Sequence, residues 1–229
     1  MRGKRTLIRR IYEQLLKAYG PQHWWPAEGE DELIIGIVLT QNAAWSNVER
    51  ALSRLKEAGA CDLRSALSLP DARLAELIRP AGYFNLKTRR LKAVARYFIE
   101  RWDCDYASMR RADPMELREE LLGVYGLGRE SVDCVLLYLL GFPVFVIDAY
   151  TLRIGARHGL FAEGASYEEA RRIFESALPC DAAQFNEYHA LLVQVGKHQC
   201  KPKPRCEGCP LNQRRNFPDP AALPGHNQR

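Results

Sequence analysis

The sequence predicts an all-α protein, and three features of the chain support this fold class. Apolar residues recur at helical spacing, as in residues 6–19, where Leu7 and Ile11 fall on one face. Glycine and proline residues punctuate the chain, so the connections are short. No segment alternates convincingly with the period of a strand, and the one β-like run, residues 143–147, is too short to build a sheet.

The helices are expected in order along almost the whole chain. The first, residues 6–19, ends at Gly20-Pro21, where glycine and proline interrupt helical geometry. The others are expected at residues 32–40, 47–58, 62–68, 71–79, 87–101, 114–123, 129–140, 149–158, 166–178 and 183–196. Residues 218–229 are rich in proline, alanine and polar residues, and we expect a disordered tail there.

Composition and charge narrow the class of protein. The 229 residues are 47% hydrophobic and 27% charged, and no apolar run approaches the roughly 20 residues of a membrane span. The N-terminus lacks the apolar segment of a signal peptide, so we expect a cytoplasmic protein. The net charge of +5 is concentrated in residues 1–20, residues 197–215 and a cluster between Lys87 and Arg96. Charge clusters are usually solvated faces, but three of them together with the anion-binding loop described below favour nucleic acid as the partner.

The stretch from Gly126 to Asp148 combines an anion-binding loop with a single carboxylate. Gly126-Leu127-Gly128 lies between two expected helices, where glycines allow positive φ and close approach of an anion to bare N–H groups. Asp148 follows an apolar run, and an apolar setting is where a charge has its largest effect. The alternative role for Asp148 is to cap the helix that follows it.

Two aromatic and polar segments remain open to two interpretations. Trp24, Trp25 and Pro26 form either a hydrophobic plug or a surface on which a base stacks. Gln41 and Asn42 either cap helices or point into a groove and fill a gap in a duplex.

Four motifs in the same order resemble the helix-hairpin-helix glycosylase superfamily, in particular its endonuclease III branch. These motifs are Leu39–Asn42, Gly82–Lys87, the hairpin with Asp148, and Val146–Arg153. The resemblance implies a six-helix domain over residues 30–141, a second helical domain from residues 1–29 and 142–217, and damaged double-stranded DNA in the cleft between them. It assigns DNA contacts to Gln41, Asn42, Tyr83, Asn85, Lys87, Gly126, Leu127, Gly128 and Arg129. We expect a monomer, associated with the nucleoid when bound to DNA.

One departure from this family bears on the reaction. Bifunctional members carry a sugar-attacking lysine two residues past the last hairpin glycine, and Glu130 occupies that position here. A carboxylate cannot form an imine with C1′, so lyase chemistry by this route is lost. The resemblance then leaves the monofunctional mechanism, in which Asp148 stabilises the oxocarbenium-like sugar and guides water to it.

Type III 3-methyladenine DNA glycosylases are similar in further detail. The WWP loop, the aromatic residue after the LTQN helix end and the GxGxES hairpin imply a base pocket of Trp24, Trp25, Pro26, Trp45 and Glu130. The pocket lysine of that family is missing from the matching segment, which begins at His189. That departure puts the identity of the substrate in doubt, while the other features of the resemblance imply a glycosylase for an alkylated purine. The alternatives are a glycosylase for deaminated, mismatched or oxidised bases, and a non-catalytic DNA-binding module.

The last three of the seven cysteines, Cys200, Cys206 and Cys209, resemble the [4Fe-4S] loop of the endonuclease III branch. The place of the fourth cysteine falls at Arg215, which leaves Cys180 or His198 as a fourth ligand. The alternatives are zinc, which a Cys₃His set commonly holds, and a loop without metal. In each case the loop is structural, and its basic residues, Lys201, Lys203 and Arg205, are expected to face phosphates.

Overall fold

The structure, a computed structural model, describes residues 2–212 and confirms the all-α prediction. Within these residues the chain forms helices joined by turns and loops, and no strand. The tail expected at residues 218–229 lies outside the described residues. None of the helices in the described range is both long and apolar enough to cross a membrane.

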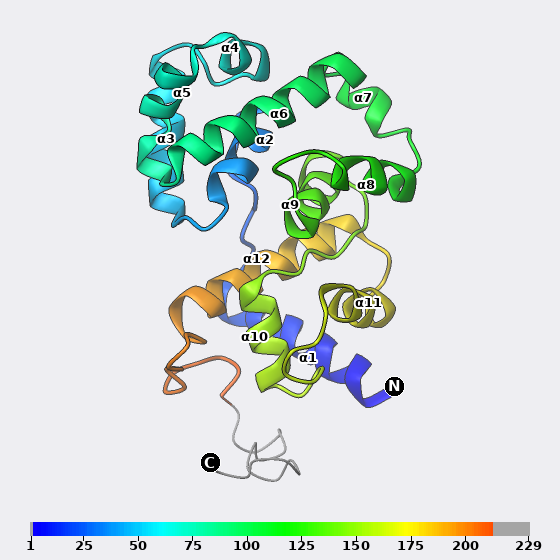
Figure 1. Ribbon diagram of the computed structural model, residues 1–229. Coiled ribbons are helices and arrows are strands. Elements are labelled where there is room, and N and C mark those ends of the chain that lie inside the picture. The colour runs from blue at the N-terminus through cyan, green and yellow to red at the C-terminus, as the bar shows by residue number, and fades with distance from the viewer. Residues whose placement is uncertain (1, 213–229) are drawn as a thin grey trace. The chain divides into compact units, whose positions relative to one another are not determined.

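The chain divides into two compact units (Figure 1). The terminal unit combines Met1–Trp24 with Phe145–Arg229, and the central unit is Trp25–Val144. The terminal unit contains α1 (Arg2–Tyr19), α10 (Ala149–Arg157), α11 (Tyr167–Ala177) and α12 (Ala182–His198). The central unit contains α2 (Glu30–Thr40), α3 (Trp45–Glu57), α4 (Leu63–Ser68), α5 (Asp71–Leu77), η1 (Arg79–Ala81), α6 (Phe84–Trp102), α7 (Tyr106–Met109), α8 (Pro114–Leu122), α9 (Arg129–Cys134) and η2 (Val135–Leu139).

Helix α2 forms the core of the central unit. Its sequence is apolar on all sides between Leu33 and Leu39, and all of these residues are buried. It packs against α3, α6, α9 and η2. Because α2 is enclosed by its neighbours, the polar residues directly after its end are held at a defined place on the unit's surface.

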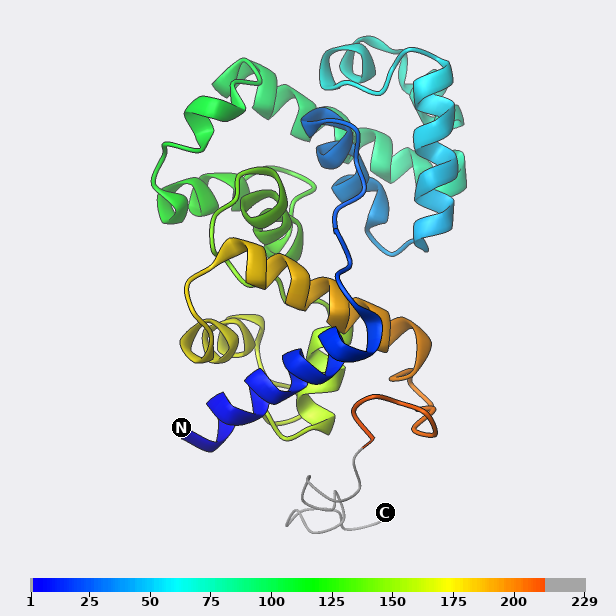
Figure 2. The same ribbon diagram turned by 180° about the vertical axis from the view of Figure 1, so that it is seen from behind.

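The terminal unit is built around α12, which packs against α1 and α10 (Figure 2). The rings of Phe145 and Phe174 stack with centroids 4.4 Å apart, and Tyr188 of α12 meets both rings edge-on. The Tyr188 hydroxyl donates a hydrogen bond to the Ile8 carbonyl at 2.8 Å, so this buried polar group is satisfied. These contacts fix the apolar run that leads to Asp148.

The helix expected at residues 129–140 differs from the structure. It is α-helical only to Cys134, and η2 continues as a π-helical turn in which the Leu140 N–H reaches the Val135 carbonyl at 3.1 Å. π-Turns are rare inserts that shift the side chains that follow them around the helix. The short elements η1 and α7 were not expected either, because three or four residues carry too little periodicity to detect.

A buried ion pair joins the two helices that flank the hairpin. Arg118 of α8 donates to Asp133 of α9 through Nε at 2.6 Å and Nη2 at 3.2 Å. Both side chains are almost fully buried, so the two-pronged geometry compensates for their lost hydration. The pair fixes α8 against α9.

Candidate functional site

The two hairpin glycines have different roles. Gly126 has φ +102°, and a Cβ there would lie 2.7 Å from the Cβ of Arg90 on α6. Gly128 is extended, at φ −102°, and caps the N-terminus of α9. Glycine allows positive φ at both positions, and only Gly126 adopts it. Apart from its two chain neighbours, no described residue lies within 4 Å of a Cβ added at Gly128, and Gly128 is exposed, so its backbone is open to an approaching ligand.

Gln41 connects the end of α2 to the hairpin. Its Nε2 donates to the Gly126 carbonyl at 2.7 Å and to the Ser131 Oγ at 3.0 Å. Its Oε1 accepts a hydrogen bond from Arg90 Nη1 at 2.7 Å. Both ends of this amide are therefore engaged within the central unit. The structure brings Gln41 together with the hairpin, as the motif resemblance requires of a shared DNA-binding face.

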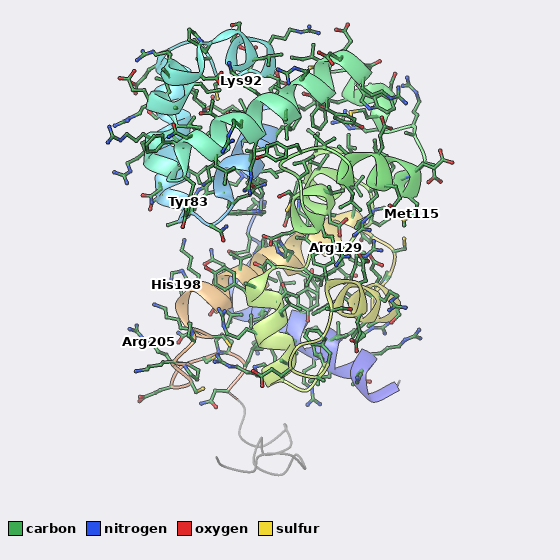
Figure 3. The ribbon with its side chains drawn as sticks, in the orientation of Figure 1. Tyr83, Lys92, Met115, Arg129, His198 and Arg205 are labelled. Atoms are coloured by element: carbon green, nitrogen blue, oxygen red, sulfur yellow. The ribbon has the colours of Figure 1, made fainter. Side chains whose placement is uncertain are left out.

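The other residues predicted to bind DNA are not equally accessible. Tyr83 is 69% exposed and caps the N-terminus of α6 with a left-handed backbone, φ 46°. Asn42, Asn85 and Arg129 are exposed as well. Figure 3 shows Tyr83 at the start of α6 and Arg129 at the start of α9. The Leu127 side chain is buried, so a DNA contact at Leu127 is restricted to its backbone.

The expectation that Lys87 contacts DNA is wrong for this conformation. Lys87 is 1% exposed, and its Nζ donates to the carbonyls of Leu39 at 2.7 Å and Ala81 at 2.8 Å. Burial, with a further contribution from Arg90, lowers the pKa of Lys87 to about 8. The motif led to this error because a lysine after an exposed turn is usually solvated, and here the helix directs it inward.

The residues of the predicted base pocket are divided between the two units. The ring of Trp25 lies 5.3 Å from that of Trp45 and 5.5 Å from that of Tyr138, centroid to centroid. Pro26 and Trp45 line an open hollow of about 570 Å³, which Trp25 does not line. Trp24 belongs to the terminal unit and is half-buried. Glu130 is exposed on the first turn of α9.

Asp148 caps the N-terminus of α10, as its place directly before an expected helix indicated. Its Oδ1 accepts a hydrogen bond from the Thr151 N–H at 2.6 Å. The carboxylate is nearly buried, at 8% exposure, beyond an extended run held by α11. In that run the Phe145 N–H donates to Glu175 Oε1 at 3.0 Å. Helix capping fixes the position of this carboxylate and leaves its second oxygen for other interactions.

That second oxygen faces a histidine of the same unit. Asp148 Oδ2 lies 3.7 Å from Nε2 of His189 on α12. His189 is buried, and burial lowers its pKa although the negative charge of Asp148 opposes this change. A neutral imidazole near a carboxylate leaves the negative charge of Asp148 unneutralised, as electrostatic stabilisation of a cation requires.

The cysteine loop is held by two arginines of α10. Arg153 Nε donates to the Cys200 carbonyl at 2.6 Å, and Arg157 donates to the carbonyls of Lys201 at 2.6 Å and Pro202 at 2.8 Å. Arg157 Nη1 also lies 3.2 Å from Cys200 Sγ. The nearby Cys200 and Cys206 add to the effect of burial, which raises the pKa of Cys209.

These thiols do not fit a [4Fe-4S] cluster, which needs four thiolates. The loop supplies three, one of them already contacted by a guanidinium, and Cys180 and His198 are exposed. Within residues 2–212 no three histidine, cysteine or acidic side chains are grouped closely enough to hold a metal ion. No chemistry is therefore assigned to a cluster here.

Four residues of the site were not identified from the sequence. Arg90 and Ser131 engage Gln41, Tyr138 packs on Trp25, and His189 faces Asp148. Arg90 appeared only as part of a basic cluster, and His189 only as a departure from a family motif. The position of Tyr138 depends on the π-turn, which left no signal in the sequence.

A family pattern and a curated relative both match most of this chain. The pattern described as HhH-GPD superfamily base excision DNA repair protein matches residues 35–180. A Methanocaldococcus jannaschii protein, named as a candidate DNA repair glycosylase, is 43% identical over 212 residues, 92% of this chain and 96% of that protein.

Two solved structures share the fold. H. pylori 3-methyladenine DNA glycosylase, bound to 1,N6-ethenoadenine, has a TM-score of 0.71 and 24% identity, over 85% of this chain and 97% of that one. A trapped endonuclease III–DNA covalent intermediate has a TM-score of 0.76 and 22% identity, over 90% and 93%. The family pattern and the 43% identical relative agree with the motif resemblance. The chain belongs to the HhH-GPD superfamily of base excision DNA repair proteins and is a DNA glycosylase of that family.

Proposed function

We propose that the protein is a monofunctional DNA glycosylase that acts as a monomer on double-stranded DNA. It flips an alkylated purine such as 3-methyladenine out of the stack and hydrolyses its N-glycosidic bond. The observation that carries this proposal is Glu130, which presents an exposed carboxylate where bifunctional relatives carry the attacking lysine. Without an amine at this place, base removal proceeds by water and the strand stays intact.

Asp148 carries the chemistry in this proposal. As the glycosidic bond breaks, positive charge develops on the sugar, and a fixed carboxylate stabilises that charge. Its capping bond to the Thr151 N–H sets the side-chain rotamer before the substrate arrives. Low solvent exposure strengthens the interaction, because little water remains to screen it. The same carboxylate orients the water molecule that attacks C1′.

The aromatic residues support an alkylated purine as the substrate. Trp25, Trp45 and Tyr138 form a contiguous set of electron-rich rings. Such rings attract a cationic methylated base, whose glycosidic bond is already weakened. The fold shared with the H. pylori 3-methyladenine glycosylase covers 97% of that chain and adds support.

The central unit grips the duplex. The open backbone at Gly128 and the exposed Arg129 approach phosphates, which supply most of the non-specific affinity. Tyr83 and Gln41 fill the space that the flipped base leaves. The exposed ring of Tyr83 is suited to stacking between bases.

The test measures base release from a panel of duplexes, each with one lesion, and compares wild-type protein with Asp148→Asn. Asparagine also caps helices, so this variant keeps the fold of α10 and loses the charge. Wild-type protein is expected to release 3-methyladenine, and Asp148→Asn to do so at least about 10²-fold more slowly. Release of only deaminated, mismatched or oxidised bases would contradict the proposal that the substrate is an alkylated purine. Binding of every duplex without any release would indicate a non-catalytic module.

A further inference from the structure

Two cations of α6 contact three segments to which the proposed function assigns DNA binding. Lys87 and Arg90 lie three residues apart and so share one side of the helix. Lys87 Nζ donates to the Leu39 carbonyl, two residues before Gln41, and to the Ala81 carbonyl, two residues before Tyr83. One buried ammonium therefore connects the Gln41 segment (residues 40–43) to the Tyr83 turn (residues 81–84).

Arg90 extends this connection to the hairpin. Its Nη1 donates to Gln41 Oε1 at 2.7 Å, and Gln41 Nε2 donates in turn to the Gly126 carbonyl at 2.7 Å. The stem of Arg90 also lies directly against Gly126, where an added Cβ would come within 2.8 Å of its Cγ. The hairpin is thus held to α6 by packing and through the Gln41 amide.

The chemistry of these partners explains why cations are suited to this place. Leu39 is in the last turn of α2, where carbonyls lack partners within the helix and the helix dipole is negative. A buried lysine is stable only when its amine is hydrogen-bonded, and both of its acceptors are backbone atoms at fixed positions. The interaction therefore restrains the backbone of both segments.

We propose that Lys87 and Arg90 are positioning residues that hold the Gln41 segment (residues 40–43), the Tyr83 turn (residues 81–84) and the hairpin in register for probing DNA. Neither residue needs to touch the substrate. The proposal rests on the proposed function for the DNA contacts of these segments. The connection itself does not depend on DNA and is tested separately.

The first test measures amide hydrogen exchange without DNA. Lys87→Met is expected to speed exchange at residues 40–43 and 81–84 together by about tenfold or more, since a lost bond to a charged amine shifts local opening by that order. Lys92→Met is the matched control. Lys92, further along α6 in Figure 3, donates to the Leu69 carbonyl at 2.6 Å, away from all three segments. Exchange that stays unchanged at either segment, or rises evenly along the chain, would overturn the proposal.

The second test is a double-mutant cycle on duplexes with a single tetrahydrofuran abasic analogue. Gln41→Ala is expected to weaken binding by about tenfold in wild-type and Lys92→Met backgrounds, and by less than about threefold with Arg90→Met. If Arg90 only stabilised the fold, Gln41→Ala would weaken binding by the same factor in the Arg90→Met background as in the wild type. That result would overturn the proposal. Arg90 is only half-buried, so we expect Arg90→Met to fold even if Lys87→Met does not. In that case the double-mutant cycle still tests the proposal. If wild-type protein does not prefer the abasic duplex over an undamaged one, the proposed function is contradicted. The hydrogen-exchange test uses no DNA, so its result still tests the role of Lys87.

Discussion

The carboxylate of Asp148 faces the buried imidazole of His189, with Oδ2 and Nε2 3.7 Å apart. Asp148 is the N-cap residue of α10 and His189 is in α12, and these two helices pack against each other. Burial lowers the pKa of His189, and the negative charge of Asp148 opposes that change. The pair therefore joins the proposed catalytic group to a residue whose protonation affects the stability of the fold.

His189→Gln should reduce the loss of stability at acidic pH. The unfolded imidazole binds a proton near pH 6.5, and the folded one only at lower pH. The unfolded state therefore holds more protons as the pH falls below about 6.5, and wild-type stability decreases there. Above that pH His189 contributes no such effect. Melting temperatures between pH 5 and 8 check this. Burial also lowers the pKa of His158, but His158 is present in both proteins and so does not contribute to the difference between them. Superimposable profiles of the two proteins would refute the role of His189.

Alanine at the two hairpin glycines should separate stability from DNA binding. Gly126→Ala forces positive φ on a side chain that also meets Arg90, and we expect a loss of about 1–3 kcal/mol of unfolding free energy. Gly128→Ala has neither problem and should keep its stability within about 1 kcal/mol. Its methyl group would obstruct a phosphate, so duplex binding should weaken. Unchanged binding by a stable Gly128→Ala variant would argue against a phosphate at this glycine.

The buried pair between α8 and α9 should be far more sensitive to substitution than an exposed pair. Asp133→Asn leaves Arg118 buried and charged, and we expect about 3–5 kcal/mol lower unfolding free energy. Glu120→Gln removes the half-buried partner of the exposed Arg101 and should cost less than about 1 kcal/mol. Urea denaturation measures both, and similar losses in the two variants would show that the buried pair has no special role.

The cysteine loop should keep its fold without metal. Arg153 and Arg157 hold the loop by bonds to its backbone, and three thiols fall short of a cluster's four. Freshly purified protein is expected to be colourless, with the same melting temperature before and after treatment with a chelator. Brown protein with stoichiometric iron, or bound zinc whose removal lowers the melting temperature, would contradict this expectation.

Helical periodicity and turn residues were sufficient to predict the all-α fold. The helix of residues 183–196 appears as α12 with its buried apolar face, because spacing alone determines which side chains face the core. The π-turn at Val135–Leu139 was not predictable, since its extra residue changes hydrogen bonding without changing composition. The position of Tyr138 against Trp25 depends on that turn.

Motifs in the sequence predicted only part of the candidate site. The hairpin glycines and Asp148 could be proposed as site residues because their residue types suit the expected chemistry, and Gln41 because its motif resembles that of the family. Lys87 was assigned to the surface because sequence does not reveal whether a charged side chain has backbone acceptors inside the fold. His189 was missed as a partner of Asp148 because the two lie 41 positions apart, and only tertiary packing brings them together.

Borohydride reduction during reaction with duplex DNA that contains an abasic site distinguishes base removal without strand cleavage from lyase chemistry. An enzyme that forms an imine with the sugar is trapped as a covalent protein–DNA complex, and an endonuclease III treated in parallel shows that the trap works. With Glu130 at the position of the attacking lysine, we predict no trapped complex and an intact strand. Efficient trapping of the wild-type protein would show that an amine of the protein attacks the sugar and that the protein is not monofunctional.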